Sequence, residues 1–320
     1  MRLPIDPGVA FLLAWRAAER LPEAVVRGAM LVAADVAWLA RGAGVRRLEA
    51  NLRRARPDAD AAALRRLSRE GMRTYLRYYA EAFTLGKPSD EQILARVRVV
   101  GAPAVQEHLG AGRSVVLTLG HQGNWDLAGA WASRHLAPVT TVAERLEPPE
   151  VFEEFVRLRE GHGMSIIPLD AGSDVFRELI AAVRRGGLLV PLLADRDLTA
   201  RGVEVDLLGE RARVAAGPAA LAAATGAPLF ATSIRHERLH GARRRAAGSR
   251  WGIVLTFHPE VVTPTEVPRA ERVQRLTQAW VDALGADIAE HPTHWHMLQR
   301  VFVADLDPER YAATTAGAAS

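Results

Sequence analysis

One stretch, residues 114–131 with the sequence SVVLTLGHQGNWDLAGAW, constrains the fold of this chain more than any other. Residues 114–119 form a short apolar run rich in β-branched side chains, which is typical of a strand covered on both faces, and Gly120 ends it. The next residues, Gln122, Gly123 and Asn124, favour a turn and supply a helix N-cap. The sequence therefore predicts that His121 lies where a buried strand ends and turns into a helix.

This position suits His121 to general-base catalysis. An imidazole titrates near neutral pH, and a carboxylate on its second ring nitrogen fixes the tautomer and stabilises the imidazolium. Asp126, in the first turn of the predicted helix, is the candidate carboxylate. The His-x4-Asp spacing is weak evidence by itself, because among ten histidines a chance match is about an even bet. However, no other histidine of the chain has Asp five residues later. The alternative is a turn in which His121 caps the helix or satisfies a buried carbonyl.

The rest of the chain predicts an α/β fold. Predicted strands alternate with predicted helices after residue 96, and two more strands and a long helix follow a basic loop at 240–250. The strands are at 96–100, 114–119, 139–143, 165–169, 188–194, 227–234 and 251–258, and the helices at 102–109, 149–161, 174–185, 217–225 and 269–290. A further long helix is predicted before them, at 61–83. Such alternation predicts a central, mainly parallel β-sheet flanked by helices.

Charged residues appear abruptly at the ends of three predicted strands. Ligands gather at the carboxyl ends of strands in a sheet of this kind, and His121 is at one such end. Asp195 and Arg196 follow an uncharged strand, and Glu144 follows another. These residues are candidates for the same site. The alternative for Asp195 is a structural ion pair with a neighbouring arginine.

The first 79 residues have the composition of helices that lie on an anionic membrane surface. They contain fifteen Arg against eight Asp and Glu, together with apolar stretches at 9–15 and 24–40. Charged residues interrupt the apolar positions, so no run reaches the roughly eighteen residues that a spanning helix needs. A secretory signal is not expected either. Peripheral membrane contact is predicted, with a solvated helix face or a nucleic-acid patch as alternatives.

Composition and spacing also exclude several kinds of site. The chain has no cysteine, so a disulfide, a thiolate zinc site and a cysteine nucleophile are excluded. His291, His294 and His296 have no carboxylate at ligand spacing, and no metal site is predicted. One domain is expected over residues 1–307, made of a helical membrane-associating part (1–86) and an α/β catalytic core (87–307). The tail 308–320 is expected to be disordered.

Four runs of sequence resemble the bacterial acyltransferase family of lipid A lauroyl and myristoyl transferases, in the family's order. They are GHQGNWDLAGAW, VAERLEPPEVFEEFVRLREGHGMSIIPL, VPLLADRDLTARGVEVDLLGERARVAAGPAALAAATGAPLF and HPTHWHMLQRVF. Within the family, they are most similar to the branch of phosphatidylinositol mannoside acyltransferases. The resemblance covers most of the chain, roughly residues 10–305.

The resemblance implies an O-acyltransferase that moves a palmitoyl chain from acyl-CoA to a mannose hydroxyl of a phosphatidylinositol mannoside. His121 would be the general base, no bound cofactor would be needed, and the enzyme would be peripheral on the cytoplasmic face of the cell inner membrane. The family places a catalytic acidic residue at Asp195, where its closest relatives carry Glu. It also implies that Glu144 lines the acceptor pocket, and that Arg159 and Arg201 contact the acyl donor.

Two other functions remain open at the level of sequence. A lipid A-type enzyme would use acyl carrier protein as donor, and a non-catalytic membrane-surface binding protein would keep the fold without turnover. Carrier proteins are acidic and need a basic docking surface, whereas coenzyme A needs only a few arginines at its phosphates. Residues 80–320 have a net charge of −3. This balance favours acyl-CoA.

Overall fold

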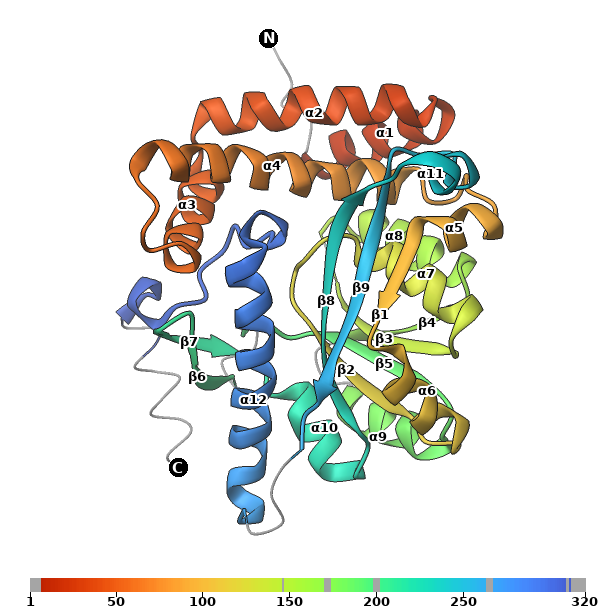
Figure 1. Cartoon of the computed structure of the whole chain (residues 1–320), viewed down its shortest axis with the longest axis vertical. Helices are drawn as coiled ribbons and strands as arrows, with labels where there is room; N and C mark the ends of the chain where they lie inside the picture. Colours follow the sequence, from red (N-terminus) through yellow and green to blue (C-terminus); the bar gives the residue numbers. More distant parts are fainter. Residues whose placement is uncertain are drawn as a thin grey trace.

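The computed structural model has a seven-stranded β-sheet at its centre (Figure 1). It describes residues 7–145, 147–169, 174–197, 202–262, 267–308 and 311. The strand order is β1 (Val97–Val100), β9 (Trp251–Glu260), β8 (Leu229–Arg238), β2 (Val115–Leu119), β5 (Leu189–Leu193), β3 (Val139–Glu144) and β4 (Met164–Leu169). Within this sheet β8 and β9 pair antiparallel, and the other neighbours pair parallel. The predicted α/β class is confirmed.

Helices cover both faces of the sheet because the central strands are apolar on both sides. On one face, Val115, Leu117 and Leu119 of β2 pack with α5 (Asp90–Arg96), α6 (Ala102–Gly110) and α7 (Trp125–His135). On the other face, Val116 packs with α9 (Val175–Arg185), α10 (Gly217–Thr225) and α12 (Arg269–Glu290). The connection from β3 to β4 is α8 (Pro149–Gly161). Strand–helix–strand connections of this length are what parallel pairing requires.

Four N-terminal helices cover one end of the sheet, at the top of Figure 1. They are α1 (Pro7–Arg20), α2 (Glu23–Ala40), α3 (Ala43–Ala55) and α4 (Ala61–Phe83). The short C-terminal helix η1 (Pro292–His294) packs on α4. Apolar side chains on α1 and α2 and the turn between them are solvent-exposed: Val9, Leu13, Leu21, Val25, Leu31, Val32, Val36 and Leu39. Within the described ranges, no helix combines the length and the apolar character that a bilayer-spanning segment needs.

Two elements differ from the expectations. A two-stranded hairpin, β6 (Val203–Leu207) and β7 (Glu210–Val214), packs on α12 and was not predicted, although its alternating apolar and charged residues are typical of a strand pair. Its two-residue turn holds Leu208 at φ 54° and Gly209 at φ 81°, the conformation that tight hairpins favour. The loop predicted at 240–250 contains α11 (Gly241–Ala247), because its Ala and Arg residues are good helix formers and Gly248 ends the helix at φ 59°.

The expected disordered tail lies mostly outside the described residues. Tyr311 is described, and its hydroxyl donates to Glu204 while its backbone N–H donates to the carbonyl of Asp307. These contacts attach the end of the described chain to β6.

Asn51 connects the N-terminal helices to the C-terminal segment, and its loss should destabilise the fold. The buried Asn51 Nδ2 donates to the backbone carbonyls of Met297 at 2.8 Å and Gln299 at 3.1 Å. Asn51→Leu keeps the branched shape of the side chain but removes the donor to both carbonyls, so we expect the free energy of unfolding in urea to fall by about 1–3 kcal/mol. Arg53→Ala on the same helix is the control, since Arg53 is exposed. Equal unfolding midpoints for the two variants would contradict this role.

Candidate active site

Sheet register brings His121 and Asp195 together from distant parts of the chain. The parallel strands β2 and β5 pair so that Leu119 lies opposite Leu193, and the N–H of Ala194 donates to the carbonyl of Leu119. His121 and Asp195 each come two residues after this matched pair. They therefore emerge at the same height on the carboxyl edge of the sheet, where α/β proteins place their ligands.

His121 and Asp195 form a buried carboxylate–imidazole pair. The Nδ1 atom of His121 lies 2.5 Å from Oδ1 of Asp195, and the His121 backbone N–H donates to Oδ2 at 2.9 Å. The indole N–H of the fully buried Trp295 donates to the same Oδ2 at 2.8 Å. Burial alone would raise the pKa of Asp195, but the charge and hydrogen bonds of His121, with help from Trp295, outweigh burial and lower it. Asp195 is therefore a charged carboxylate.

The imidazole of His121 is oriented for proton transfer. A carboxylate on Nδ1 requires the proton there, which leaves the lone pair of the neutral ring on Nε2. The side chain is 23% exposed, and Nε2 has no hydrogen-bond partner in the part of the chain that the structure describes. An oriented imidazole with an open Nε2 can accept a proton from a substrate hydroxyl.

Asp126 does not take the position on His121 that its spacing suggested. Its Oδ2 accepts from the hydroxyl of Tyr78 at 2.8 Å, and its Oδ1 accepts from Nε of Arg159 at 2.7 Å. The reason is the direction of α7, whose first turn points Asp126 towards α4 and α8 while the sheet register brings Asp195 to the imidazole. The prediction that Asp126 is the carboxylate on the His121 ring was therefore wrong, because Asp195 takes that position. Asp126 instead holds together three helices around the site.

The Asp126–Arg159 pair is buried and charged. Only 1% of the Asp126 side chain and 15% of the Arg159 side chain are exposed. Burial lowers the pKa of Arg159, but the adjacent Asp126 carboxylate outweighs burial and raises it above its ordinary value. Burial raises the pKa of Tyr78, which stays a neutral hydrogen-bond donor. Arg159 is thus a permanent cation, held in a fixed position.

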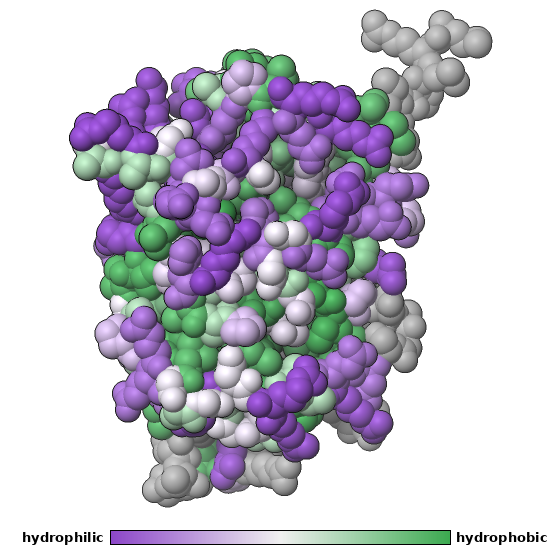
Figure 2. Space-filling view, turned by 90° about the vertical axis from the view of Figure 1, so that its right-hand side faces the viewer, coloured by the Kyte–Doolittle hydropathy of each residue, from purple (hydrophilic) through white to green (hydrophobic). Residues whose placement is uncertain are grey.

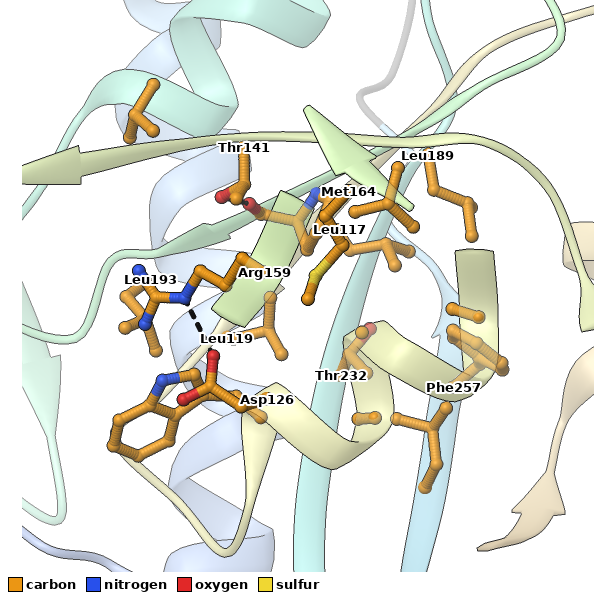
Figure 3. A pocket seen from close by; sticks show the side chains of 18 residues that line it. Leu117, Leu119, Asp126, Thr141, Arg159, Met164, Leu189, Leu193, Thr232 and Phe257 are labelled. Atoms are coloured by element: carbon orange, nitrogen blue, oxygen red, sulfur yellow. Dashed lines mark hydrogen bonds and ion pairs between the residues drawn. The ribbon is translucent and has the colours of Figure 1, made fainter. Parts of the chain in front are cut away.

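An apolar cavity begins at this pair and extends between α7 and the sheet (Figure 3). Leu119 and Leu193, at the carboxyl ends of β2 and β5, line it near the Asp126–Arg159 pair, and Leu189 and Met164, at the amino ends of β5 and β4, line it at the other end. The cavity encloses ≈ 710 Å³, its open mouth included. Its lining therefore follows the strands along their whole length, which is the direction that an extended apolar chain would take.

Small residues on one side of α7 make room for this cavity. Ala128, Gly129 and Ala132 line it, and a Cβ at Gly129 would lie 2.5 Å from the sulfur of Met164. Trp125 also lines it, and its ring lies 5.8 Å from that of His121, edge to face. The mouth of the cavity is therefore close to the general-base candidate.

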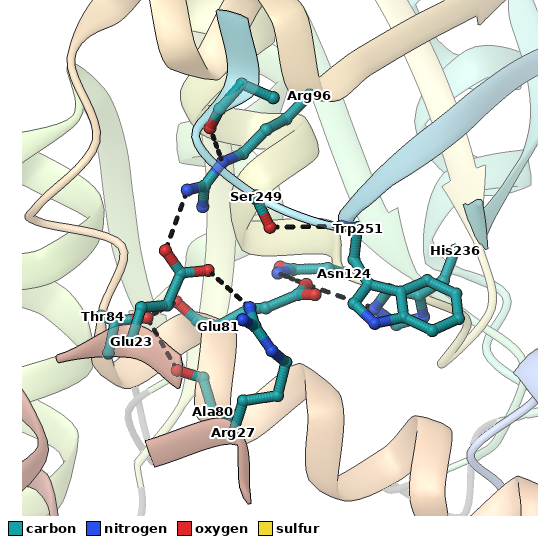
Figure 4. A network of polar contacts seen from close by, with 11 residues as sticks. Glu23, Arg27, Ala80, Glu81, Thr84, Arg96, Asn124, His236, Ser249 and Trp251 are labelled. Atoms are coloured by element: carbon teal, nitrogen blue, oxygen red, sulfur yellow. Dashed lines mark hydrogen bonds and ion pairs between the residues drawn. The ribbon is translucent and has the colours of Figure 1, made fainter. Parts of the chain in front are cut away.

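A second buried network fixes the loop that carries His121 (Figure 4). Asn124 caps α7 by accepting from the N–H of Leu127 at 2.9 Å, and its amide donates to Glu81 of α4 at 2.8 Å. Glu81 also lies 3.2 Å from Nε2 of His236. Burial would raise the pKa of Glu81, but His236 and Asn124 outweigh burial and lower it. The N-cap of α7 is thus anchored to a charged carboxylate.

The backbone of the same loop is held from two sides. Gly123 has φ 56°, and a Cβ there would lie 2.5 Å from the carbonyl oxygen of Ile234, so only glycine fits. The N–H of Gly123 donates to His294, and the N–H of His296 donates to the carbonyl of His121 at 2.7 Å. The C-terminal segment thus pairs with the loop and delivers Trp295 to Asp195.

The remaining predicted site residues are less involved. Glu144 lies at the end of β3 with 51% of its side chain exposed, and its nearest charge is Arg196 at 3.7 Å. Arg201 lies outside the described residues.

In the described ranges, no three His, Asp or Glu side chains are grouped to hold a metal. Burial lowers the pKa of His294 to about 2, so this histidine is neutral.

The sequence alone did not single out Tyr78, Glu81 or Trp295. Tyr78 and Glu81 lie three residues apart in the predicted helix 61–83, and so share the face that meets the active-site loop. The available signal was Glu81 itself, a carboxylate on a helix face that is otherwise largely apolar. The role of Trp295 depends on the path of the C-terminal segment, for which the sequence carries no signal.

Comparison with known proteins identifies the family. Residues 7–303 match the family described as bacterial lipid A biosynthesis acyltransferase. The chain belongs to this acyltransferase family. Two relatives in it are named phosphatidylinositol mannoside acyltransferase. The one from Mycolicibacterium smegmatis is 36% identical over 316 residues, 97% of each chain, and the one from Mycobacterium tuberculosis H37Rv is 35% identical over 323 residues, 98% of this chain and 96% of that one. The resemblance found in the sequence is confirmed.

A solved structure is more distantly similar. The 1-acyl-sn-glycerophosphate acyltransferase PlsC from Thermotoga maritima aligns with 85% of this chain and 98% of its own, at 15% identity and a TM-score of 0.36. The match is too weak to support an argument about the site, which therefore depends on the geometry described above.

Removal of the general-base candidate should abolish acyl transfer. His121→Ala should lower kcat by about two to four orders of magnitude, because no other residue that the structure describes offers an open, oriented base beside the cavity. Asp195→Asn should cost nearly as much, since an amide neither enforces the tautomer nor stabilises the imidazolium. Transfer from a radiolabelled acyl donor measures both, and thermal melting checks that the variants are folded. Retention of more than about a tenth of the wild-type kcat by folded His121→Ala would exclude the assignment.

Asp126→Asn should behave differently from Asp195→Asn. An amide at position 126 can keep the hydrogen bond to Tyr78 but removes the charge that holds Arg159, so the mouth of the cavity should loosen. We expect KM for the acyl donor to rise several-fold, with a smaller loss of kcat than in Asp195→Asn. Initial rates at varied donor concentration separate the two constants. Identical kcat losses with unchanged donor KM would place Asp126 in the proton-transfer machinery.

Proposed function

We propose that this chain transfers a palmitoyl group from acyl-CoA to a mannose hydroxyl of a phosphatidylinositol mannoside. The observation that supports this most directly is the open Nε2 of His121 beside the mouth of an apolar cavity. The relatives named phosphatidylinositol mannoside acyltransferase, similar over nearly the full length of the chain, support the choice of acceptor.

The chemistry follows from the pair of His121 and Asp195. The mannose hydroxyl gives its proton to Nε2, and its oxygen attacks the thioester carbonyl. The new C–O bond forms as the C–S bond breaks, and the leaving thiolate takes the proton back from the imidazolium. Asp195 stabilises the imidazolium between these steps. The acyl group passes directly from donor to acceptor, with no covalent enzyme intermediate.

The cavity explains how a long acyl chain is held. Each methylene group buried in an apolar lining contributes about 0.8 kcal/mol, so a long chain is bound far more tightly than an acetyl group. With the chain along the strands, its carbonyl carbon comes to the mouth, where Arg159 and His121 lie. Arg159 is the fixed cation available to the donor there.

The acceptor is a lipid, so the enzyme acts at a membrane surface, in our proposal the cytoplasmic face of the inner membrane. The exposed apolar side chains of α1 and α2 support this location. Hydrophobic atoms lie among hydrophilic ones at the top of the face in Figure 2, the end at which Figure 1 places these helices. A helix pair with this surface can lie on the bilayer and present the sheet edge to lipid head groups.

The identity of the donor separates this proposal from a lipid A-type reaction. Palmitoyl-CoA and palmitoyl-carrier protein are offered at equal concentration with a radiolabelled phosphatidylinositol mannoside, and kcat/KM is compared. We expect acyl-CoA to be preferred, because the catalytic part of the chain is net acidic and repels an acidic carrier protein. A preference for the carrier protein would favour the lipid A-type reaction, and no transfer from either donor would favour a binding protein.

Filling the cavity from α7 should shorten the preferred acyl chain. Ala132→Leu adds a side chain to the cavity wall one helical turn beyond Ala128. We expect kcat/KM for C16 to fall about tenfold or more relative to C10 and C12, since each displaced methylene loses about 0.8 kcal/mol. His135→Leu, at the exposed end of the same helix, is the control. An unchanged chain-length profile in Ala132→Leu would place the acyl chain elsewhere.

A further inference from the structure

A second pocket opens between the N-terminal helices and the start of β9. It is lined by Arg27 and Leu31 of α2, Arg73 and Arg77 of α4, and Arg250 and Trp251, and encloses ≈ 930 Å³ with its mouth. Its charged lining residues are all arginines. None of these residues lines the acyl cavity. The pocket is therefore a separate site with an excess of positive charge.

Arg77 is the central group of this pocket. Its side chain is 10% exposed, and its guanidinium stacks on the ring of Trp251, 3.7 Å from the ring centroid. Two carboxylates act on its charge, Glu81 one helical turn further along α4 and Glu70 at 3.9 Å, and within the described residues the guanidinium donates no hydrogen bond. A nearly buried guanidinium normally has acceptors for its N–H groups. Arg77 instead lines the pocket, where its donors are available to a ligand.

The neighbouring arginines do not lack charge partners, but they share them. Arg27 and Arg96 both donate to Glu23, as Figure 4 shows. In the same way, Arg69 and Arg73 both donate to Asp35. Each carboxylate is thus divided between two cations, and the region keeps a net positive charge. An anion with several acceptor oxygens would complete the hydrogen bonding of Arg77 and balance this charge.

The rim of the pocket shows what kind of anion fits. Leu31 lines the pocket and is 44% exposed, and along the same helix Val32, Val36 and Leu39 are 64%, 59% and 67% exposed. An apolar row beside a cationic pocket matches a molecule with an anionic head and a hydrocarbon tail. A Cβ at Gly28, which also lines the pocket, would meet no atom within 4 Å, so there is open space at this point.

We propose that this pocket binds the phosphodiester of an anionic membrane phospholipid, with Arg77 as the main ligand and the apolar row of α2 in contact with the lipid chains. The proposal deepens the membrane location argued above and rests on it. A bound phospholipid would fix the orientation of α2 and α4 on the bilayer. Because α4 carries Tyr78 and Glu81, the active-site loop would then be held at a set height above the membrane.

The test compares two arginine variants of the same helix. Arg77→Met keeps an apolar stem over Trp251 and removes the phosphate ligand, whereas Arg66→Met removes an exposed charge from α4. Binding of the full chain is measured by flotation with phosphatidylcholine vesicles that contain 0% or about 30% phosphatidylinositol. We expect Arg77→Met to lose about tenfold or more in affinity for the anionic vesicles and Arg66→Met to lose about twofold or less. Equal losses would reduce the effect to general surface charge and overturn the proposal.

A second variant checks the result without removal of a charge. Gly28→Gln places a side chain in the open space of the pocket and keeps every arginine, so it should also weaken binding to anionic vesicles and leave binding to neutral vesicles unchanged. If both pocket variants bind anionic vesicles as the wild type does, the proposal is wrong.

Competition distinguishes a lipid from other sources of phosphate. Free coenzyme A and inorganic phosphate are added at constant ionic strength. If either displaces the wild type from anionic vesicles at low concentration, and Arg77→Met raises KM for acyl-CoA, the pocket is a donor site and the proposal fails. Transfer to acceptor in detergent micelles is measured in parallel, and we expect Arg77→Met to keep the wild-type rate there. Absence of transfer by the wild type itself would refute the proposed reaction while the vesicle result still decides on the pocket.

Discussion

The buried carboxylate of Asp195 is the group on which the active site depends. It is 1% exposed, and a charge in such a place is tolerated only because three donors surround it. Two of these donors belong to His121 at the end of β2, and the third belongs to Trp295 in the C-terminal segment. The charge that orients the imidazole therefore also ties together two strand ends and a segment about a hundred residues further along the chain. The catalytic geometry exists only when all three have folded into place.

The two aspartates near the site have different physical tasks. Asp195 acts on the imidazole, and through it on the proton. Asp126 binds Tyr78 of α4 and Arg159 of α8, so it joins the helices that surround the cavity mouth. Both are nearly inaccessible to water, and both are balanced by a fixed partner. In the proposed reaction, this division lets a single sheet edge hold a base for a polar hydroxyl close to an apolar cavity for a fatty chain.

Polar and apolar groups are also separated between different parts of the molecule. The sheet interior and α7 provide a channel that is apolar except for the Asp126–Arg159 pair at one end, whereas many cations lie on the N-terminal helices beside exposed apolar side chains. The helix α4 connects the two regions, because it carries Arg77, which lines the basic pocket, and also Tyr78 and Glu81, which bind Asp126 and Asn124 of the active-site segment. In our proposal, contact of this helix with a membrane surface would be coupled, through these side-chain contacts, to the loop of His121.

The sequence by itself determined the alternation of strands and helices, the position of His121 at a strand end and the family, because these depend on local patterns: runs of apolar residues, glycine at turns and ordered motifs. The bounds of α4, α8 and α12 were predictable for the same reason. Only the tertiary structure decided which carboxylate meets the imidazole. Asp126 is close to His121 along the chain, but helix direction points it away, while the register of β2 and β5 brings Asp195 from 74 residues away. Likewise, the missing hydrogen bonds of Arg77 could not be read from its sequence neighbours, since they result from how α2, α4 and β9 pack around it.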